Sequence, residues 1–220
     1  MTTTLQNPKV AQALDRMYRE SAKQMSALRD RRASLFQPSA TPQERADALS
    51  EFYLPVTPVA GRLLYALVRG IRPNTVVEFG MSLGISAIHL ASAVRDNGSG
   101  RVVTTELSAA KIAAAKKTFA ETGLDDVITV LEGDALTTLE SLDGPVDFVL
   151  LDGWKEFYLP VIKLLEPRLS SGALVVADNT DMDDTKPYLE YVRDPDNGYV
   201  SVNFLARDAD SMEITCRATV

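Results

Sequence analysis

The sequence predicts an α/β fold: a doubly wound, mostly parallel β-sheet covered by helices, with an antiparallel C-terminal hairpin strand and additional N-terminal helices. From residue 73 onward, short apolar runs alternate with helical segments, which is the order of parallel strands joined by crossover helices. The last two apolar runs are joined by a polar turn, which indicates a hairpin at the sheet edge. Residues 1–56 show helical spacing instead, so we expect a helical extension or cap over 1–56 and a single globular domain over 57–220.

The N-terminal segment contains start and stop signals for three helices. The first helix is closed by the Arg-Asp-Arg-Arg run at 29–32. Thr-Pro-Gln-Glu at 41–44 has the form of a capping box with proline at the first helical position, and it predicts a helix to about Phe52. Thr57-Pro58 repeats this start signal, and Gly70 supplies the stop. The first helix has an apolar face at Val10, Leu14, Met17, Met25 and Leu28.

Each strand of the predicted sheet is a short apolar run bounded by turn residues. Strands are expected at 75–79, 101–106, 126–131, 146–151 and 173–177, followed by hairpin strands at 199–205 and 212–217 around a polar turn at 207–211. Helices are expected at 85–94, at 108–119 with a stop at Gly123, and at 156–169. Helices that connect parallel strands lie on the faces of the sheet, so both faces should be covered.

Composition and charge limit the classes of partner. Hydrophobic residues make up 45% and charged residues 24% of the 220 residues, as in a folded globular protein. The net charge of −7 disfavours nucleic acid, because a phosphate backbone is also negative. No apolar run approaches the ~20 residues of a membrane helix, and the polar residues 1–8 lack an apolar signal segment. With one cysteine, Cys216, and so no intrachain disulfide, we expect a cytoplasmic protein with a small-molecule partner, no nucleic acid and no membrane.

A glycine-rich turn follows the first predicted strand and opens a helix. Gly80 and Gly84 let the backbone approach a ligand closely, and this strand ends at the switch point of a doubly wound sheet. The spacing G-x-x-x-G differs from the dinucleotide fingerprint, and the turn lacks the G-K-[ST] of a phosphate loop. Glu78 at the strand tip would repel a pyrophosphate, so the turn suits a ligand with positive charge or ribose hydroxyls. The alternative is that Glu78 is a solvated strand end.

Two further carboxylates follow the next strands. Glu106 ends the second strand, where it could accept both hydroxyls of a ribose. Asp134, after Gly133, ends the third strand, where it could accept an exocyclic adenine amine. Three neighbouring strand tips would thus offer groups to an amino acid, a ribose and a base. This arrangement resembles the class I S-adenosylmethionine-dependent methyltransferases, which have a Rossmann-like sheet.

The fourth and fifth strands end in hard ligands. Asp152 follows the fourth strand, and Asp178 and Asn179 follow the fifth, so adjacent parallel strands would place all three at one sheet edge. Carboxylate and amide oxygens suit Mg²⁺, with Mn²⁺ or Ca²⁺ as alternatives. His89, the one histidine, falls inside a helix and is expected to be structural, so no His–Cys cluster competes for zinc. The alternative is that Asp178 and Asn179 form an ordinary turn.

The residues around these ligands resemble a narrower family. Asp-x-x-Lys after the fourth strand and Asp-Asn after the fifth are similar to the cation-dependent O-methyltransferases, which include the catechol and caffeoyl-coenzyme A enzymes. The run 152–160 (Asp-Gly-Trp-Lys-Glu-Phe-Tyr-Leu-Pro) is most similar to the catechol type. The resemblance covers about residues 54–217 and implies Lys155 as general base and Asp152, Asp178 and Asn179 as metal ligands. It assigns to the S-adenosylmethionine site Val56, Glu78, Gly80, Met81, Ser82, Gly84, Ser86, Glu106, Asp134, Ala135, Asp152 and Trp154.

The implied reaction is transfer of a methyl group from S-adenosylmethionine to a hydroxyl of a small phenolic or catechol-like substrate. A phenol is mostly protonated at pH 7, and a bound dication lowers the pKa of the hydroxyl and orients it. Lys155 could accept the proton, and two adjacent hydroxyls could chelate the cation. The alternative for Lys155 is a solvated lysine at a helix start.

Alternative functions are methylation of a non-catechol substrate and a cofactor-binding interaction module without catalysis. Methylation of nucleic acid is disfavoured by the charge and by the absence of a Pro-Pro dipeptide. The family resemblance also implies a homodimer, for which the N-terminal helices could supply an interface. The sequence does not give the substrate.

Some positions depart from the family pattern. Gly153 stands where the catechol enzymes have a histidine, which removes one cofactor contact. The acidic residue that would hold a second hydroxyl is not identifiable, with Asp208 and Asp210 in the last turn as candidates. The acidic cluster at 181–184 (Asp181, Asp183 and Asp184) is expected to cap the following helix rather than bind cations.

Overall fold

A seven-stranded mixed sheet forms the centre of the computed structural model, which describes residues 2–35, 40–207 and 210–218 and leaves aside the side chains of 31–35, 206, 207 and 210. The strands are β1 (Thr75–Phe79), β2 (Arg101–Glu106), β3 (Ile128–Glu132), β4 (Val146–Leu151), β5 (Leu169–Ala177), β6 (Tyr199–Arg207) and β7 (Asp210–Arg217). Their order is β3-β2-β1-β4-β5-β7-β6. The neighbouring pairs among β1 to β5 are parallel, and β7 is antiparallel to both β5 and β6. The predicted α/β class with an antiparallel C-terminal hairpin is therefore confirmed.

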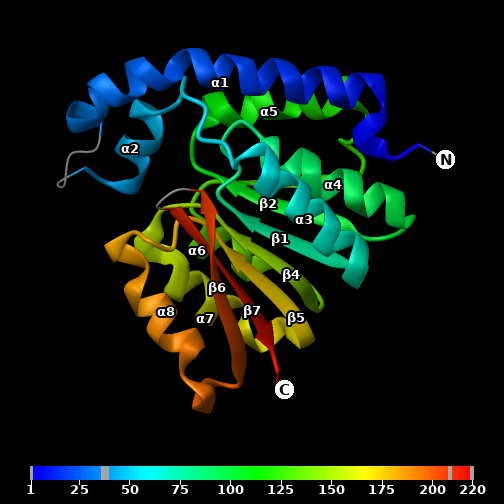
Figure 1. The fold of residues 1–220 in the computed structure, drawn as a ribbon, viewed down its shortest axis with the longest axis vertical. Coiled ribbons are helices and arrows are strands. Elements are labelled where there is room, and N and C mark those ends of the chain that lie inside the picture. Colours follow the sequence, from blue (N-terminus) through cyan, green and yellow to red (C-terminus); the bar gives the residue numbers. More distant parts are fainter. Residues whose placement is uncertain (1, 36–39, 208–209, 219–220) are drawn as a thin grey trace.

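Helices cover both faces of the sheet (Figure 1). They are α1 (Pro8–Leu35), α2 (Pro42–Ala48), α3 (Pro58–Ile71), α4 (Ile85–Asn97), α5 (Ala109–Thr122), α6 (Ala135–Thr138), α7 (Tyr158–Leu165) and α8 (Lys186–Arg193). Buried residues of α1, α3, α4 and α5 form one hydrophobic core with the sheet, and those of α6, α7 and α8 form a second core. The sheet thus separates two apolar layers, as expected for parallel strands buried on both faces.

Alternate residues of each central strand enter opposite cores, because successive side chains of a strand point to opposite faces. Val76 of β1 and Phe148 of β4 belong to the core under α3 and α4. Their neighbours Val77 and Val149 belong to the core under α7 and α8. All four side chains are fully buried, so the register of β1 and β4 is fixed by packing on both sides.

The N-terminal helix joins the first of these cores. Val10, Leu14 and Met17 of α1 are buried in the core that α3, α4 and α5 share, and Arg16 forms an ion pair of 2.8 Å with Glu121 of α5. Figure 1 shows α1 running alongside α5 across one end of the molecule. The boundary at residue 56 between a cap and a main domain stays a prediction. In the described part of the chain, none of the helices combines the length and apolar character needed to cross a membrane.

Three N-terminal helices end at other residues than expected. The Arg-Asp-Arg-Arg run does not close α1, which continues to Leu35. α3 runs through Gly70 to Ile71, and Arg72 takes the left-handed cap conformation with φ 53°. Gly70 is therefore not the residue at which α3 ends. α2 has the predicted capping box but ends at Ala48, before Phe52.

The segment predicted as one helix over 156–169 is divided. Two 3₁₀ turns, Lys155–Phe157 and Glu166–Arg168, flank α7. Pro167 lacks the N–H that a continuing α-helix would use, so the α-helix ends before it. β5 then begins at Leu169, four residues earlier than the predicted start of 173.

The carboxyl ends of the five parallel strands lie at one edge of the sheet. Phe79 at the end of β1 pairs with Leu151 at the end of β4, which pairs with Ala177 at the end of β5. On the other side, Glu106 at the end of β2 pairs with Glu132 of β3. The loops that carry the predicted site residues therefore start from one row of strand tips.

Candidate active site

The glycine turn after β1 is packed directly against the end of β4. Gly80 has φ 96°, and a Cβ atom on it would lie 2.5 Å from Gly153 Cα. Gly84, with φ 90°, precedes α4, and a Cβ atom there would lie 2.7 Å from the ring of Phe119. Both glycines are required by conformation and by space. The turn therefore brings backbone groups to the tip of β4, where the predicted metal ligand Asp152 begins its loop.

Glu78 is fully buried beneath this turn and is only half satisfied. Its Oε2 accepts a hydrogen bond from the Thr104 hydroxyl, while Oε1 has no hydrogen-bond partner in the described part of the chain. Burial raises the pKa of Glu78 to about 7, against the opposing effect of the Ser86 and Thr104 hydroxyls, and the charge of Glu106 raises it further. The interpretation of Glu78 as a solvated strand end is therefore wrong. An unsatisfied buried carboxylate oxygen fits a ligand with a protonated amine.

Glu106 is held at the tip of β2 by the backbone. Its Oε2 accepts from the Ser82 N–H at 2.8 Å, and its Oε1 accepts from the N–H groups of Leu107 at 3.0 Å and Ser108 at 2.9 Å. Ser82, like Gly80, has positive φ, at 50°. The carboxylate is thus fixed in orientation beside the glycine turn, with acceptor capacity left for hydroxyl groups.

Lys111 of α5 completes this corner, although no sequence motif marked it. It is only 4% exposed, and its Nζ donates to the Ser82 hydroxyl at 3.0 Å. Burial lowers the pKa of Lys111, and the nearby Glu106 carboxylate opposes this effect. A lysine three residues into a helix usually faces solvent, so only the tertiary packing could have shown that this one supports the turn.

Asp134 and Ala135 lie at the next tip along the row. The Gly133 N–H donates to the Glu106 carbonyl oxygen at 2.9 Å, which joins the end of β3 to the end of β2. Asp134 is exposed and caps α6 by accepting from the Leu136 N–H at 3.0 Å. Ala135 is buried. The three predicted cofactor-side carboxylates therefore come from three neighbouring strand tips.

The predicted metal ligands meet on the other side of the glycine turn. The Asp152 N–H donates to the Phe79 carbonyl at 2.9 Å, and the Asp178 N–H donates to the Leu151 carbonyl at 3.0 Å. These bonds continue the parallel ladder beyond the strands and place Asp152 and Asp178 side by side. Asn179 follows with a left-handed backbone, φ 56°.

Asp152 responds to its burial and to the charges around it. Burial raises the pKa of Asp152, Lys155 opposes this, and the charges of Asp178 and Glu78 raise the pKa further. Asp178 is itself 6% exposed. A cluster of three or more His, Cys, Asp or Glu side chains able to hold a metal is absent from the described part of the chain. The predicted ligand set, Asp152, Asp178 and the amide of Asn179, has the oxygen donors that fit a hard divalent cation.

Lys155 reaches back toward this pair of acids. Its Nζ lies 3.3 Å from Asp152 Oδ1 and donates to the Tyr158 hydroxyl at 2.8 Å. Tyr158, fully buried, donates in turn to the Asp178 carbonyl oxygen at 3.0 Å. The Lys155 side chain is 12% exposed, so the reading of Lys155 as a solvated lysine is wrong. Tyr158 belongs to the run 152–160 but had no predicted role, and it lies one helical turn after Lys155 on the same face.

A cap of N-terminal residues covers the loop after β4. Trp154 packs with Leu28 of α1 and with Leu49 and Phe52, which follow α2. The Arg45 guanidinium lies 4.3 Å from the Trp154 ring centroid and also pairs with Glu156. These contacts place α2 against the segment that carries the predicted catalytic residue.

The chain that follows this cap closes over the glycine turn. A small pocket there is lined by Tyr53, Leu54, Pro55, Met81, Ser82, Leu83, Ile85 and Ser86. Val56 is 2% exposed and belongs to the core beside it. The other predicted cofactor residues lie at the glycine turn or at the neighbouring strand tips and their loops. Val56 instead follows directly after the segment that covers the turn.

Other predicted positions fall outside this group. His89 is buried against Gly61, with its Nε2 3.4 Å from the Tyr18 hydroxyl, and burial lowers its pKa to about 4. A structural role for His89 is thus supported. Asp208 lies outside the described residues, and so does the side chain of Asp210.

The acidic cluster at 181–184 does not act as a side-chain cap. Asp183 lies in the first turn of a 3₁₀ segment, Asp183–Thr185, whose cap residue Met182 makes no side-chain bond. Asp183 instead pairs with Lys186 at 2.6 Å. The prediction of capping by this cluster is therefore wrong in its mechanism, although the cluster does lie at a helix start.

Gly153 has a packing reason. A Cβ atom there would lie 2.5 Å from the Phe79 ring. A larger residue at 153 would displace this ring, because the Phe79 side chain at the end of β1 already fills the space beside Gly153.

The chain is similar to known methyltransferases. Residues 77–180 match a family model described as a methyltransferase domain. The chain is 35% identical over 144 residues to a probable O-methyltransferase of Mycobacterium tuberculosis, covering 60% of each chain. It is 31% identical over 140 residues to the catechol O-methyltransferase of Sus scrofa, covering 60% of this chain and 74% of that protein. The chain spans 60% of the length of the Mycobacterium tuberculosis protein, and 56% and 52% of the length of the catechol O-methyltransferases of Mus musculus and Danio rerio.

The fold is also shared with solved structures. An O-methyltransferase from Bacillus cereus in complex with SAH superimposes with a TM-score of 0.69, at 19% identity, covering 91% of this chain and 99% of that one. At this level of identity the likeness concerns the fold.

Proposed function

The chain belongs to the O-methyltransferase family that includes the catechol O-methyltransferases, and we propose that it transfers a methyl group from S-adenosylmethionine to a hydroxyl of a small phenolic or catechol-like molecule. One observation carries the proposal. The buried Asp178 and the nearly buried pair Asp152 and Lys155 lie beside the carboxylate of Glu78, one oxygen of which lacks a hydrogen-bond partner in the described part of the chain. This combination offers both a cation site and a base next to a position for a charged cofactor.

The glycine turn and its neighbouring strand tips would hold the cofactor. Glu78 Oε1 would accept a hydrogen bond from the amino group, which would satisfy its missing partner. Glu106 is oriented by three backbone N–H groups and would accept the ribose hydroxyls. Asp134 would accept the adenine amine. When bound, S-adenosylmethionine supplies an activated methyl group on its sulfonium.

The loops after β4 and β5 would hold a divalent cation and activate the substrate. Asp152, Asp178 and Asn179 would bind the ion, which lowers the pKa of a coordinated hydroxyl and fixes its orientation. Lys155, in its neutral form, would accept the hydroxyl proton at Nζ. Tyr158 holds that nitrogen at 2.8 Å and is itself anchored to the Asp178 carbonyl, so base and ligands are positioned by the same side chain.

The cap would exclude water and contact the substrate ring. Trp154 and Phe52 belong to a small apolar cluster over the loop that carries Lys155. A flat phenolic ring suits such a surface, because aromatic rings stack or pack edge to face on one another. Substrate identity would then depend on this cap.

The test is methyl transfer to catechol, to its isomer resorcinol, whose hydroxyls are not adjacent, and to phenol, which has one hydroxyl. S-adenosylhomocysteine formation is measured with Mg²⁺, with EDTA, and after Mg²⁺ is restored. We expect turnover to stop with EDTA and to return with Mg²⁺. Catechol should be preferred, because only its adjacent hydroxyls can chelate one ion.

The outcomes separate the alternatives. Activity that survives complete chelation would overturn the metal mechanism. Equal rates with catechol and resorcinol would overturn chelation by a diol and favour a non-catechol substrate. Tight cofactor binding by calorimetry without turnover on any hydroxyl substrate would favour an interaction module.

A further inference from the structure

The turn after β5 carries two of the predicted metal ligands in a conformation that needs support. Asn179 has φ 56°, in the left-handed region that non-glycine residues adopt at a cost of order 1 kcal/mol. Asparagine tolerates this region better than most residues. Neighbouring groups must nevertheless hold Asp178 and Asn179 in place, because a free turn would relax toward more populated conformations.

Thr180, the next residue, is bonded through every polar group it has. Its N–H donates to the Ser211 carbonyl at 2.9 Å, and its own carbonyl accepts from the Thr185 hydroxyl at 3.2 Å. Its hydroxyl shares a hydrogen bond of 2.8 Å with the Ser211 hydroxyl and accepts from Asn203 Nδ2 at 2.9 Å. Thr180 and Ser211 are only 5% and 6% exposed, so water does not compete for these bonds.

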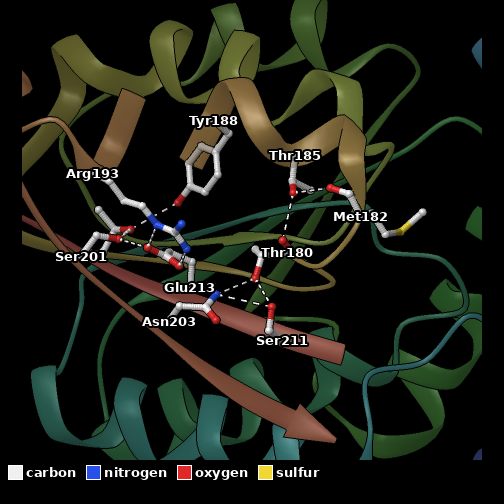
Figure 2. Close-up of polar contacts among 10 residues, drawn as sticks. Thr180, Met182, Thr185, Tyr188, Arg193, Ser201, Asn203, Ser211 and Glu213 are labelled. Carbon is white, nitrogen blue, oxygen red and sulfur yellow. Dashed lines mark hydrogen bonds and ion pairs between the residues drawn. The ribbon is translucent and has the colours of Figure 1, made fainter. Parts of the chain in front are cut away.

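The partners come from separate elements that converge on the turn. Figure 2 shows Asn203 from β6 and Ser211 from β7 beside Thr180, with Thr185 on its other side. The Thr185 hydroxyl also bonds the Met182 carbonyl at 2.6 Å, and the Met182 N–H donates to the Asn179 carbonyl at 3.2 Å. The turn is therefore held by the hairpin on one side and by the start of α8 on the other.

A second polar group on the same hairpin is centred on Glu213 and adjoins the first group through Asn203, whose side chain also hydrogen-bonds Glu213. Glu213 pairs with Arg193 of α8 at 2.6 Å and accepts from the Ser201 hydroxyl at 2.6 Å (Figure 2). Ser201 also bonds the Thr215 hydroxyl at 2.8 Å. This group joins the hairpin to α8, whereas Thr180, Ser211 and Asn203 join the hairpin to the residues after β5. Deletion of one hydroxyl from each group thus gives a matched comparison.

We propose that Thr180, Ser211 and Asn203 are positioning residues that hold Asp178 and Asn179 in the geometry needed to bind the divalent cation. The inference rests on the proposed function, since it concerns the metal site assigned there. Groups that orient metal ligands typically change metal affinity by about 10–100-fold when they are removed. The hairpin would then act on the reaction through the metal site without contacting the substrate.

The experiment measures Mn²⁺ affinity directly, from the electron paramagnetic resonance signal of free Mn²⁺ titrated with the full chain. The variants are Thr180→Val, which keeps the shape and removes the hydroxyl, and Ser211→Ala. Thr180→Ser retains the hydroxyl, and Ser201→Ala is the matched control on the same hairpin. S-adenosylmethionine affinity is measured in parallel by calorimetry, and folding by thermal denaturation.

We expect Thr180→Val and Ser211→Ala to weaken Mn²⁺ binding about 10–100-fold, with Thr180→Ser and Ser201→Ala close to wild type. Cofactor affinity should stay unchanged, because Glu78 and Glu106 lie at other strand tips. Wild-type Mn²⁺ affinity in both Thr180→Val and Ser211→Ala would overturn this inference but leave the proposed function standing. An equal loss in Ser201→Ala would also overturn it, because the effect would then be one of general stability. If the wild-type protein binds no Mn²⁺, the metal site of the proposed function fails, and this inference fails with it.

Discussion

Glu78 should make cofactor binding depend on pH. Its carboxylate is fully buried, one oxygen has no partner in the described part of the chain, and its pKa is raised to about 7. A cationic amino group placed against that oxygen would favour the ionised form. Binding should therefore require Glu78 to lose its proton, and affinity should rise as the pH rises through 7.

The size of this effect follows from the pKa. If only the ionised form binds, the fraction of ionised Glu78 increases about eightfold between pH 6 and pH 7.5, and the dissociation constant should fall by the same factor. The free protein should show the opposite trend in stability. For a carboxyl whose folded pKa is about 7 and whose unfolded pKa is 4.5, the folded state holds more protons between these values. The free energy of unfolding should then fall by about 2.5 kcal/mol between pH 5 and pH 8 from this group.

Calorimetric titration of metal-free protein with S-adenosylmethionine at several pH values measures the first effect, and urea denaturation without ligand measures the second. Glu78→Gln is the matched variant, because its amide remains neutral at every pH. It should bind the cofactor weakly and without this pH dependence, and it should lack the loss of stability above pH 5. Adenosine, which has no amino acid part, is the ligand control. An eightfold pH effect that persists in Glu78→Gln, or one of equal size with adenosine, would refute the assignment.

Three other substitutions test separate parts of the site. Lys155→Ala should lower the rate of methyl transfer at least about 100-fold while the cofactor dissociation constant stays within about twofold; a large loss of affinity would indicate a structural role. Gly153→Ala should weaken cofactor binding and lower the melting temperature, because the added methyl group would lie 2.5 Å from the phenyl ring at the end of β1, whereas Gly70→Ala, which meets open space, should do neither. Lys111→Met should raise the cofactor dissociation constant about tenfold with little change in kcat, and the exposed Lys116→Met should leave both unchanged.

The central strands were predictable because a strand buried on both faces has a recognisable local sequence. The runs at 75–79, 101–106 and 146–151 agree with β1, β2 and β4 at both ends, since each is apolar or β-branched and bounded by turn residues. The single helix expected over 156–169 was wrong because Pro167 has no backbone N–H to continue an α-helix. The helical spacing of apolar residues does not indicate such a break. Element ends therefore depended on backbone details, whereas the order of elements depended on the apolar pattern.

The candidate site divides in the same way. Carboxylates such as Glu106, Asp152 and Asp178 could be placed from sequence because each follows a strand, and parallel strands end at one edge. Lys111, Tyr158 and the residues around Thr180 could not, since their roles come from contacts between segments distant in the chain, such as Lys111 with Ser82. Sequence reasoning located the predicted ligands at strand tips but not the groups that contact the turns carrying them.

The charges at this edge support the proposal that the site binds cations. Glu78, Asp152 and Asp178 are buried or nearly buried carboxylates, and Lys155 lies 3.3 Å from one of them. With all four groups ionised, their charges sum to −2. If Lys155 is neutral, as the proposed general base must be, the sum is −3, which equals in magnitude the combined charge of a divalent cation and one ammonium group. Buried carboxylates without counter-charges are destabilising, and they respond by a rise in pKa, as Glu78 and Asp152 both show. Raised pKa values of this kind are expected in the free protein if the site is arranged for the proposed positive ligands, and the same carboxylates should then return to their ionised forms when those ligands bind.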